Sequence, residues 1–173
     1  YKNRKDLNKY NQDLAVDTEG RILSDAMADA DVFIGVSGAN LLDEANIKLM
    51  AKNPIIFALA NPDPEILPSK AHAIRDDIVM ATGRSDFPNQ VNNVLGFPFL
   101  FRGALDAKAT EITNDMLLAA AHALAMLAKE PVPQSVLDAY KVDQMEFGPE
   151  YLIPKPFDPR LIEWVAKAVK DAY

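Results

Sequence analysis

Three short apolar runs occur in the first half of the chain: Asp31-Val-Phe-Ile-Gly35, Pro54-Ile-Ile-Phe-Ala-Leu-Ala60 and Asp77-Ile-Val-Met-Ala-Thr82. Each run lacks strict polar alternation, which is typical of strands that are buried on both faces of a parallel sheet. A buried helix segment is the alternative, but the runs are short and end in Gly, Asn-Pro or Gly-Arg. The pattern therefore favours three buried strands.

The spacing of these runs is regular, with 23 residues separating Val32 from Ile55 and again Ile55 from Ile78. A parallel pair of strands needs a crossover of about a dozen or more residues, usually a helix. Residues 43–52 and 68–75 are the expected crossover helices. The sequence therefore predicts a β-α-β-α-β unit with right-handed crossovers.

Further helices are expected on both sides of this unit. They cover residues 7–16, 24–28, 97–109, 114–129, 135–140 and a last segment that begins at the Asp158-Pro159 cap and ends near 172. Apolar spacing predicts that these helices and the first crossover bury one face each. The expected buried residues are Ala45, Leu49 and Met50; Met116, Ala120, Ala123, Leu124 and Leu127; and Leu161, Trp164, Val165 and Val169.

Length and composition limit the class of protein. A chain of 173 residues with 49% hydrophobic residues fits one globular domain. Its net charge of −7 makes nucleic acid and anionic membrane surfaces poor partners. The absence of cysteine excludes disulfides, thiolate metal sites and a Cys nucleophile, and it is compatible with the cytoplasm. The chain lacks both a signal-peptide core and an initiator Met, so we expect it to begin inside a longer protein.

Polar and small residues follow each expected strand. Ligands bind beyond the carboxyl ends of the strands in open α/β sheets. The residues in this position that suit a ribose, a carboxamide or a small hydroxy acid are Ser37, Asn61, Ser85, Asn92 and Asn93. The sequence thus predicts a polar crevice at one edge of the sheet.

Several polar and charged residues near the expected strand ends also have a simpler explanation than ligand binding. An Asn before Pro commonly forms a turn, so Asn61 is about evenly balanced between a turn and a ligand contact. Arg84 suits a surface ion pair better than a phosphate contact. For Asp63 and Glu65, a solvated turn is a stronger interpretation than a metal site. The two histidines, His72 and His122, have no partners at catalytic spacing.

Several nucleotide and hydrolase motifs are missing. No G-x-G-x-x-G follows a strand, and Gly35-Val-Ser-Gly38 has the wrong spacing for it. A dinucleotide site normally holds its pyrophosphate at the first strand–helix turn. That turn is expected to precede this chain.

Several segments of the chain resemble bacterial-type malic enzymes. The similar segments are Ala58-Leu-Ala-Asn-Pro-Asp-Pro-Glu-Ile66, Ala81-Thr-Gly-Arg-Ser-Asp-Phe-Pro-Asn-Gln-Val-Asn-Asn-Val-Leu-Gly-Phe-Pro98, Phe101-Arg-Gly-Ala-Leu-Asp106 and Ile153-Pro-Lys-Pro-Phe-Asp-Pro-Arg160. The resemblance covers nearly the whole chain in the right order. It implies that residues 1–173 are the C-terminal portion of the NAD(P)-binding domain. The strand–helix part is about 1–93, a partial Rossmann-like parallel sheet, and the helical part is about 94–173.

The resemblance also implies a reaction and a set of ligand contacts. The family oxidises malate with NAD or NADP and decarboxylates the product to pyruvate, with a divalent Mg or Mn ion. Asn61 is then expected to contact cofactor and substrate near the nicotinamide. Asn92 and Asn93 are expected at the nicotinamide ribose and the malate carboxylate, with Asn93 also a substrate contact. Ser37 is expected on the adenosine side of the cofactor.

The resemblance places the remaining machinery upstream. The family's catalytic Tyr and Lys, its acidic metal ligands and its phosphate loop belong to the segment before this chain, so no catalytic or metal residue is assigned here. The expected partners are that N-terminal segment, malate and further copies in a homo-oligomer. Two alternatives remain: a nucleotide-binding or assembly module without chemistry, and the cofactor domain of an amino-acid dehydrogenase.

Overall fold

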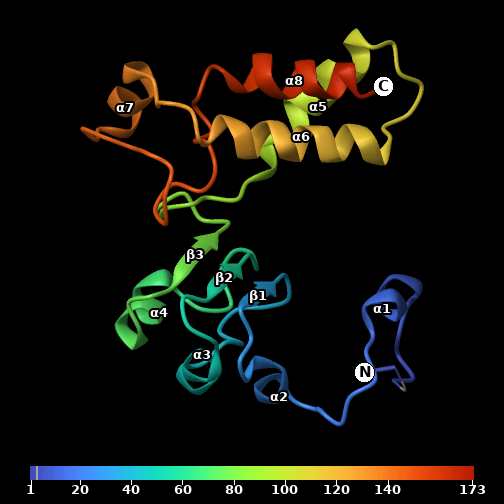
Figure 1. The fold of residues 1–173 in the computed structure, drawn as a ribbon, viewed down its shortest axis with the longest axis vertical. Coiled ribbons are helices and arrows are strands. Elements are labelled where there is room, and N and C mark those ends of the chain that lie inside the picture. Colours follow the sequence, from blue (N-terminus) through green and yellow to red (C-terminus); the bar gives the residue numbers. More distant parts are fainter. Residues whose placement is uncertain (3) are drawn as a thin grey trace.

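A computed structural model describes residues 1–2 and 4–173 (Figure 1). Its sheet consists of β1 (Val32–Gly35), β2 (Ile55–Ala58) and β3 (Val79–Thr82). The strands run parallel in the order β1-β2-β3, with Val32 opposite Ile55 and Ile55 opposite Val79. The three-stranded parallel sheet expected from the spacing of the apolar runs is confirmed.

Short helices connect the strands. The connections are α3 (Glu44–Leu49) between β1 and β2 and α4 (Pro68–Ile74) between β2 and β3. A further short helix, α2 (Leu23–Met27), precedes β1. The helix α3 begins where the Asp43 carboxylate accepts a hydrogen bond from the Asn46 backbone N–H at 2.8 Å. Proline at the first position of α4 suits a helix start, because a backbone N–H at that position would have no partner within the helix and proline lacks one.

The first crossover helix buries a different face from the one predicted. Met50 is buried as predicted, but Ala45 and Leu49 are exposed and Ile47 is buried instead. Asn46 is also buried, and its Oδ1 accepts a hydrogen bond from the Ser24 hydroxyl at 2.9 Å. This contact with α2 turns the polar Asn46 inward, which the apolar spacing alone did not indicate.

Only one face of the sheet is fully covered. Ile56, Ala58 and Met80 cluster with buried residues of α2, α3 and α4. On the opposite face, Val32 is 49% exposed and Ile34 is 63% exposed. The prediction that all strands are buried on both faces is therefore wrong for β1, because the helices of this chain gather on one side of the sheet.

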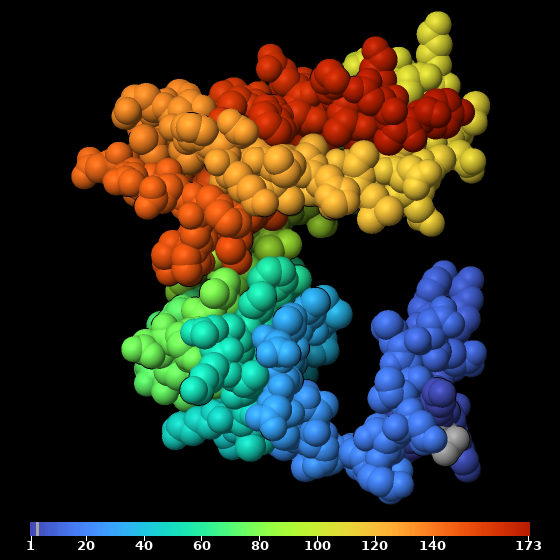
Figure 2. Space-filling model, in the orientation of Figure 1, coloured from blue at the N-terminus to red at the C-terminus, as the bar shows by residue number. Residues whose placement is uncertain are grey.

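The second half of the chain forms a helical part beyond the carboxyl ends of the strands (Figures 1 and 2). Its elements are η1 (Asn93–Leu95), α5 (Phe97–Asp106), α6 (Asn114–Leu127), α7 (Gln134–Tyr140) and α8 (Leu161–Asp171). A second hydrophobic cluster joins α5, α6 and α8. Gly103 lets α5 approach α8 closely, since a Cβ there would lie 2.5 Å from the Ala166 carbonyl oxygen.

The predicted stripes of this helical part are largely confirmed. Met116, Ala120, Ala123 and Leu127 are buried on α6, as are Leu161, Val165 and Val169 on α8, while Leu124 and Trp164 are half-buried. The start of α8 differs from the prediction by a few residues. The Asp158 carboxylate binds the backbone and guanidinium of Arg160, and the helix begins at Leu161.

The N-terminal segment contributes little to either core. It contains α1 (Lys9–Leu14), which has no buried residue, and Figure 2 shows this segment standing apart from the sheet. Asn8 caps α1 by accepting hydrogen bonds from the backbone N–H groups of Tyr10 and Asn11, both at 2.9 Å. None of the helices described is long and apolar enough to cross a membrane.

Candidate cofactor site at the strand ends

The loops that leave the three strands carry all four ligand contacts implied by the resemblance. Ser37 follows β1, Asn61 follows β2, and Asn92 and Asn93 end the loop after β3. All four residues are exposed. Because parallel strands end at the same edge of a sheet, these loops share one side of the molecule.

The loop after β1 is fastened to the loop after β2. The fully buried Glu65 accepts hydrogen bonds from the Ser37 backbone N–H at 2.9 Å and from the Ala60 backbone N–H at 3.1 Å. The Ser37 hydroxyl lies 3.5 Å from the same carboxylate. Asn40 and Leu42 donate backbone hydrogen bonds to the carbonyls of Pro64 and Glu65, both at 3.1 Å. Two of the three strand ends therefore form one connected unit.

Asn61 lies between the ends of β2 and β3. Its Nδ2 donates to the Leu59 carbonyl at 3.3 Å, and the Asn61–Pro62 peptide bond is cis. A Cβ on Gly83 would stand 3.0 Å from the Asn61 Oδ1, so the bare glycine leaves room for the amide. A turn role and an exposed amide thus coexist at Asn61.

Arg84 connects the second and third loops by charge. Its guanidinium donates to Asp86 at 2.7 Å and lies 3.6 Å from Asp63. The hydrogen bond to Arg84 holds the pKa of Asp86 below its usual value. The expected surface ion pair of Arg84 is confirmed.

The loop after β3 is held by Asn89. Its Nδ2 donates to the carbonyls of Met80 at 2.9 Å and Pro149 at 2.6 Å, and its Oδ1 accepts from the Leu152 N–H at 2.7 Å. Asn89 is 1% exposed and has a left-handed φ of 56°. This one side chain ties the sheet to the segment that precedes α8.

The two amides after this loop differ in their engagement. The Asn92 Oδ1 caps η1 by accepting from the Val94 N–H at 3.0 Å. For the Asn93 side chain, no hydrogen bond occurs within the described part of the chain. The Asn92 side-chain oxygen is therefore already used in capping η1, whereas the Asn93 amide is available to a ligand.

Comparison with known proteins connects this arrangement to a family. The sequence model described as "Malic enzyme, NAD binding domain" matches residues 2–141. The chain belongs to the malic enzyme family. Its resemblance to bacterial-type malic enzymes is confirmed, and the alternative of an amino-acid dehydrogenase is set aside.

Individual relatives agree with the family assignment. The chain is 59% identical over 169 residues to the NADP-dependent malic enzyme of Halomonas elongata, covering 98% of this chain and 40% of that protein. It is 49% identical to the NAD-dependent malic enzyme of Rhizobium meliloti, covering 99% of this chain and 22% of that protein. The crystal structure of the NAD-dependent malic enzyme from Thermotoga maritima is similar with a TM-score of 0.76 and 40% identity, covering 95% of this chain and 40% of that one. The chain thus spans less than half the length of these malic enzymes.

Sequence reasoning missed the two buried residues that organise this malic enzyme segment. Glu65 was expected in a solvated turn, which is wrong, because it is fully buried between two loops. Its neighbours Pro64 and Ile66 gave the only available signal, since an acid between apolar residues suggests a buried partner. Asn89 carried no distinguishing signal in the sequence.

A metal centre is not assembled by these residues. In residues 1–2 and 4–173, no three His, Cys, Asp or Glu side chains gather in a way that fits a metal ion. Asp77, at the entry to β3, instead pairs with Arg75 at 2.6 Å.

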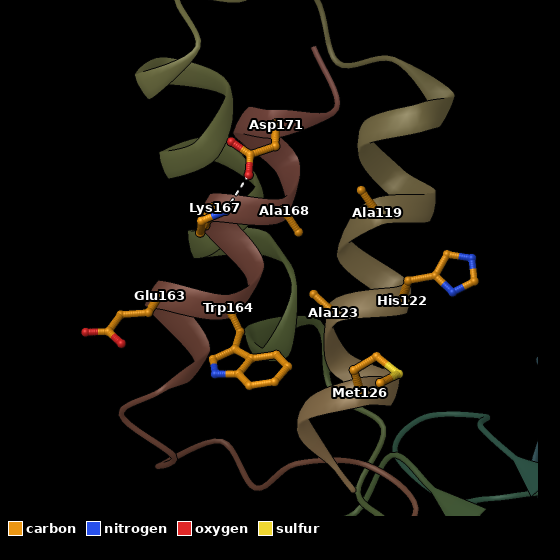
Figure 3. Close-up of a pocket in the computed structure, with 9 residues that line it drawn as sticks. All are labelled: Ala119, His122, Ala123, Met126, Glu163, Trp164, Lys167, Ala168 and Asp171. Atoms are coloured by element: carbon orange, nitrogen blue, oxygen red, sulfur yellow. Dashed lines mark hydrogen bonds and ion pairs between the residues drawn. The ribbon is translucent and has the colours of Figure 1, made fainter. Parts of the chain in front are cut away.

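A groove of about 590 Å³ between α6 and α8 lies in the helical part (Figure 3). It is lined mainly by small and apolar side chains, including Ala119, Ala123, Met126, Trp164 and Ala168. Lys167 and Asp171 at its rim are already paired with each other at 2.6 Å. The groove offers few free polar groups, so the strand ends remain the better candidate for a polar ligand.

Proposed function

We propose that residues 1–173 form the C-terminal portion of the NAD(P)-binding domain of a malic enzyme. The whole protein would oxidise malate with NAD or NADP and release pyruvate and CO2. The observation that carries the proposal is the set of strand-end loops bearing Ser37, Asn61 and Asn93, the first two joined through Glu65, in a chain of this family. The strand–helix part, about 1–93, would provide the edge of the sheet that binds the cofactor. The helical part, about 94–173, would support that edge.

The exposed amides suit a nicotinamide nucleotide and a carboxylate. Asn61 uses its Nδ2 in one hydrogen bond to Leu59, which leaves a second N–H for a ligand. Asn93 would donate to a malate carboxylate, and Asn92 would use its remaining N–H groups at the nicotinamide ribose. Ser37 would place its hydroxyl on the adenosine side. A bound nicotinamide would supply the hydride acceptor for the oxidation of malate.

The nucleotide fits the loops better than a metal does. Neutral hydroxyl and amide groups lie at the strand ends, and Gly83 gives the Asn61 amide room to approach. The described residues provide no cluster of acidic ligands. As the resemblance to malic enzymes implies, the proposal places Mg or Mn, the catalytic Tyr and Lys, and the phosphate loop in the preceding segment of the same enzyme.

The proposal includes the setting of the enzyme. The exposed apolar face of β1 is a candidate contact surface. We propose that the segment of the enzyme that precedes this chain covers it. We further propose a homo-oligomer in the cytoplasm. Malate and the nucleotide would be its small-molecule partners, with neither nucleic acid nor membrane involved.

A substitution at Asn61 tests the proposed contacts. In the longer enzyme that contains this chain, Asn61→Ala should raise the KM for NAD(P) and for malate by about tenfold, as expected for a lost hydrogen bond to a charged or polar ligand. Asn53→Ala is the matched control, because Asn53 is also exposed but precedes β2 at the opposite end of the strand. Unchanged KM values for Asn61→Ala, with normal folding, would contradict the proposal.

A nucleotide-binding module without chemistry is the second candidate. Its supporting observation is the group of exposed hydroxyl and amide side chains at the strand ends, which suits a nucleotide without requiring a catalytic residue. Titration calorimetry separates the two: this candidate requires tight NAD(P) binding by residues 1–173 alone. The principal proposal expects weak binding, because the phosphate loop is placed outside this chain.

A further inference from the structure

We propose that Glu65 is the positioning residue that fixes the loops after β1 and β2 as one surface for the nucleotide. This inference rests on the proposed cofactor site. It concerns a residue that touches no ligand and acts through Ser37 and Asn61. Its carboxylate is the only side chain that bonds to both loops in the described part of the chain.

The geometry requires two acceptors at this position. Oε1 accepts from the Ser37 N–H at 2.9 Å, and Oε2 accepts from the Ala60 N–H at 3.1 Å. A carboxylate can satisfy both donors, whereas a glutamine amide has one oxygen and would turn an NH2 group toward the other N–H. The arrangement therefore selects glutamate over its isosteric amide.

Burial adds to the demand. Glu65 is fully buried, and none of the ion pairs of the described residues includes it. A buried carboxylate without a cation must be satisfied by hydrogen bonds. The backbone N–H groups of the two loops supply these hydrogen bonds. The buried carboxylate therefore needs both loops in place, and the loops need the carboxylate to keep their relative position.

Gly35 completes the arrangement. A Cβ at Gly35 would lie 2.4 Å from the Glu65 carboxyl carbon and 2.5 Å from its Oε1. The last residue of β1 must therefore be glycine for the carboxylate to reach Ser37. The bond from the Leu59 N–H to the Gly35 carbonyl, 2.9 Å long, joins the same two strand ends.

The loop positions follow from this attachment. Ala60 directly precedes Asn61, and Ser37 itself carries the hydroxyl proposed to face the nucleotide. If the carboxylate releases either loop, the two groups lose their fixed separation. Nucleotide affinity should then fall even though neither proposed contact residue has changed.

The test compares variants of the longer enzyme. Glu65→Gln should raise the dissociation constant for NAD(P) by about tenfold, measured by calorimetry without malate. Asp158→Asn is the matched control, because Asp158 is a buried carboxylate, 3% exposed, in the helical part. It should lower the melting temperature without changing nucleotide affinity.

The outcomes separate this inference from the proposed function. If Glu65→Gln and Asp158→Asn both retain wild-type affinity while Asn61→Ala loses it, the positioning role is overturned and the cofactor site stands. If Asn61→Ala also retains affinity, the cofactor site itself fails.

A measurement on the wild-type enzyme covers the case in which Glu65→Gln does not fold. Hydrogen exchange at the Ser37 and Ala60 amides should be slow together and should slow further when NAD(P) is added. Fast, independent exchange of the two amides in the folded enzyme would overturn the role of Glu65.

Discussion

Replacing Asn89 with alanine should lower the free energy of unfolding by about 4 kcal/mol. Three hydrogen bonds would be lost, from the Asn89 amide to the Met80 and Pro149 carbonyls and from the Leu152 N–H to the Asn89 oxygen. Each contributes about 1 kcal/mol, and burial leaves their partners unsatisfied. Placing alanine at a φ of 56° adds about 1 kcal/mol, because asparagine tolerates the left-handed region better.

Asn53→Ala isolates the backbone part of this change. Asn53 has nearly the same φ, 52°, but is exposed, and its side chain makes no hydrogen bond within the described residues. Its substitution should cost about 1 kcal/mol. Urea unfolding followed by circular dichroism measures both variants. Equal losses for Asn89→Ala and Asn53→Ala would refute the conclusion that Asn89 holds the sheet to the segment before α8.

Two further predictions concern acid stability and association. The Arg75 side chain, with a smaller contribution from the Asn53 N–H, holds the pKa of Asp77 well below its ordinary value of 3.8. This stabilisation is therefore present above about pH 4 and is lost as the pH falls toward the folded-state pKa. Asp77→Asn should accordingly reduce the loss of melting temperature on acidification. An unchanged dependence of the melting temperature on acidic pH would contradict this prediction. Residues 1–173 alone should self-associate through the exposed face of β1. In sedimentation velocity, Ile34→Lys should reduce this association, whereas Leu118→Lys on α6 should not. A monodisperse wild-type monomer would contradict the prediction.

The sheet was predictable because its signals are local. Three apolar runs at equal spacing, each followed by Gly or Asn-Pro, indicate strands separated by short crossovers. The expected crossover helices, 43–52 and 68–75, agree with α3 and α4 to within a few residues. The resemblance to malic enzymes then implied which of the strand-end residues contact cofactor and substrate.

The remaining features depend on contacts between distant segments. Glu65 is buried because Gly35 and Ser37, about thirty residues earlier, accommodate and bond to its carboxylate. Asn89 forms hydrogen bonds with Pro149 and Leu152, which are about sixty residues later in the chain and follow α5, α6 and α7. Apolar periodicity carries no information about such polar partners. It also does not reveal that β1 lacks a cover on one face.

Malate-dependent formation of reduced cofactor tests the central claim most directly. It should be measured for residues 1–173 alone, for the preceding segment alone and for the two joined in one chain, each with NAD or NADP and Mg or Mn. The proposal predicts no turnover by either part and activity in the joined chain, reduced by Asn61→Ala. Turnover by residues 1–173 alone, or a folded joined chain without activity, would contradict it.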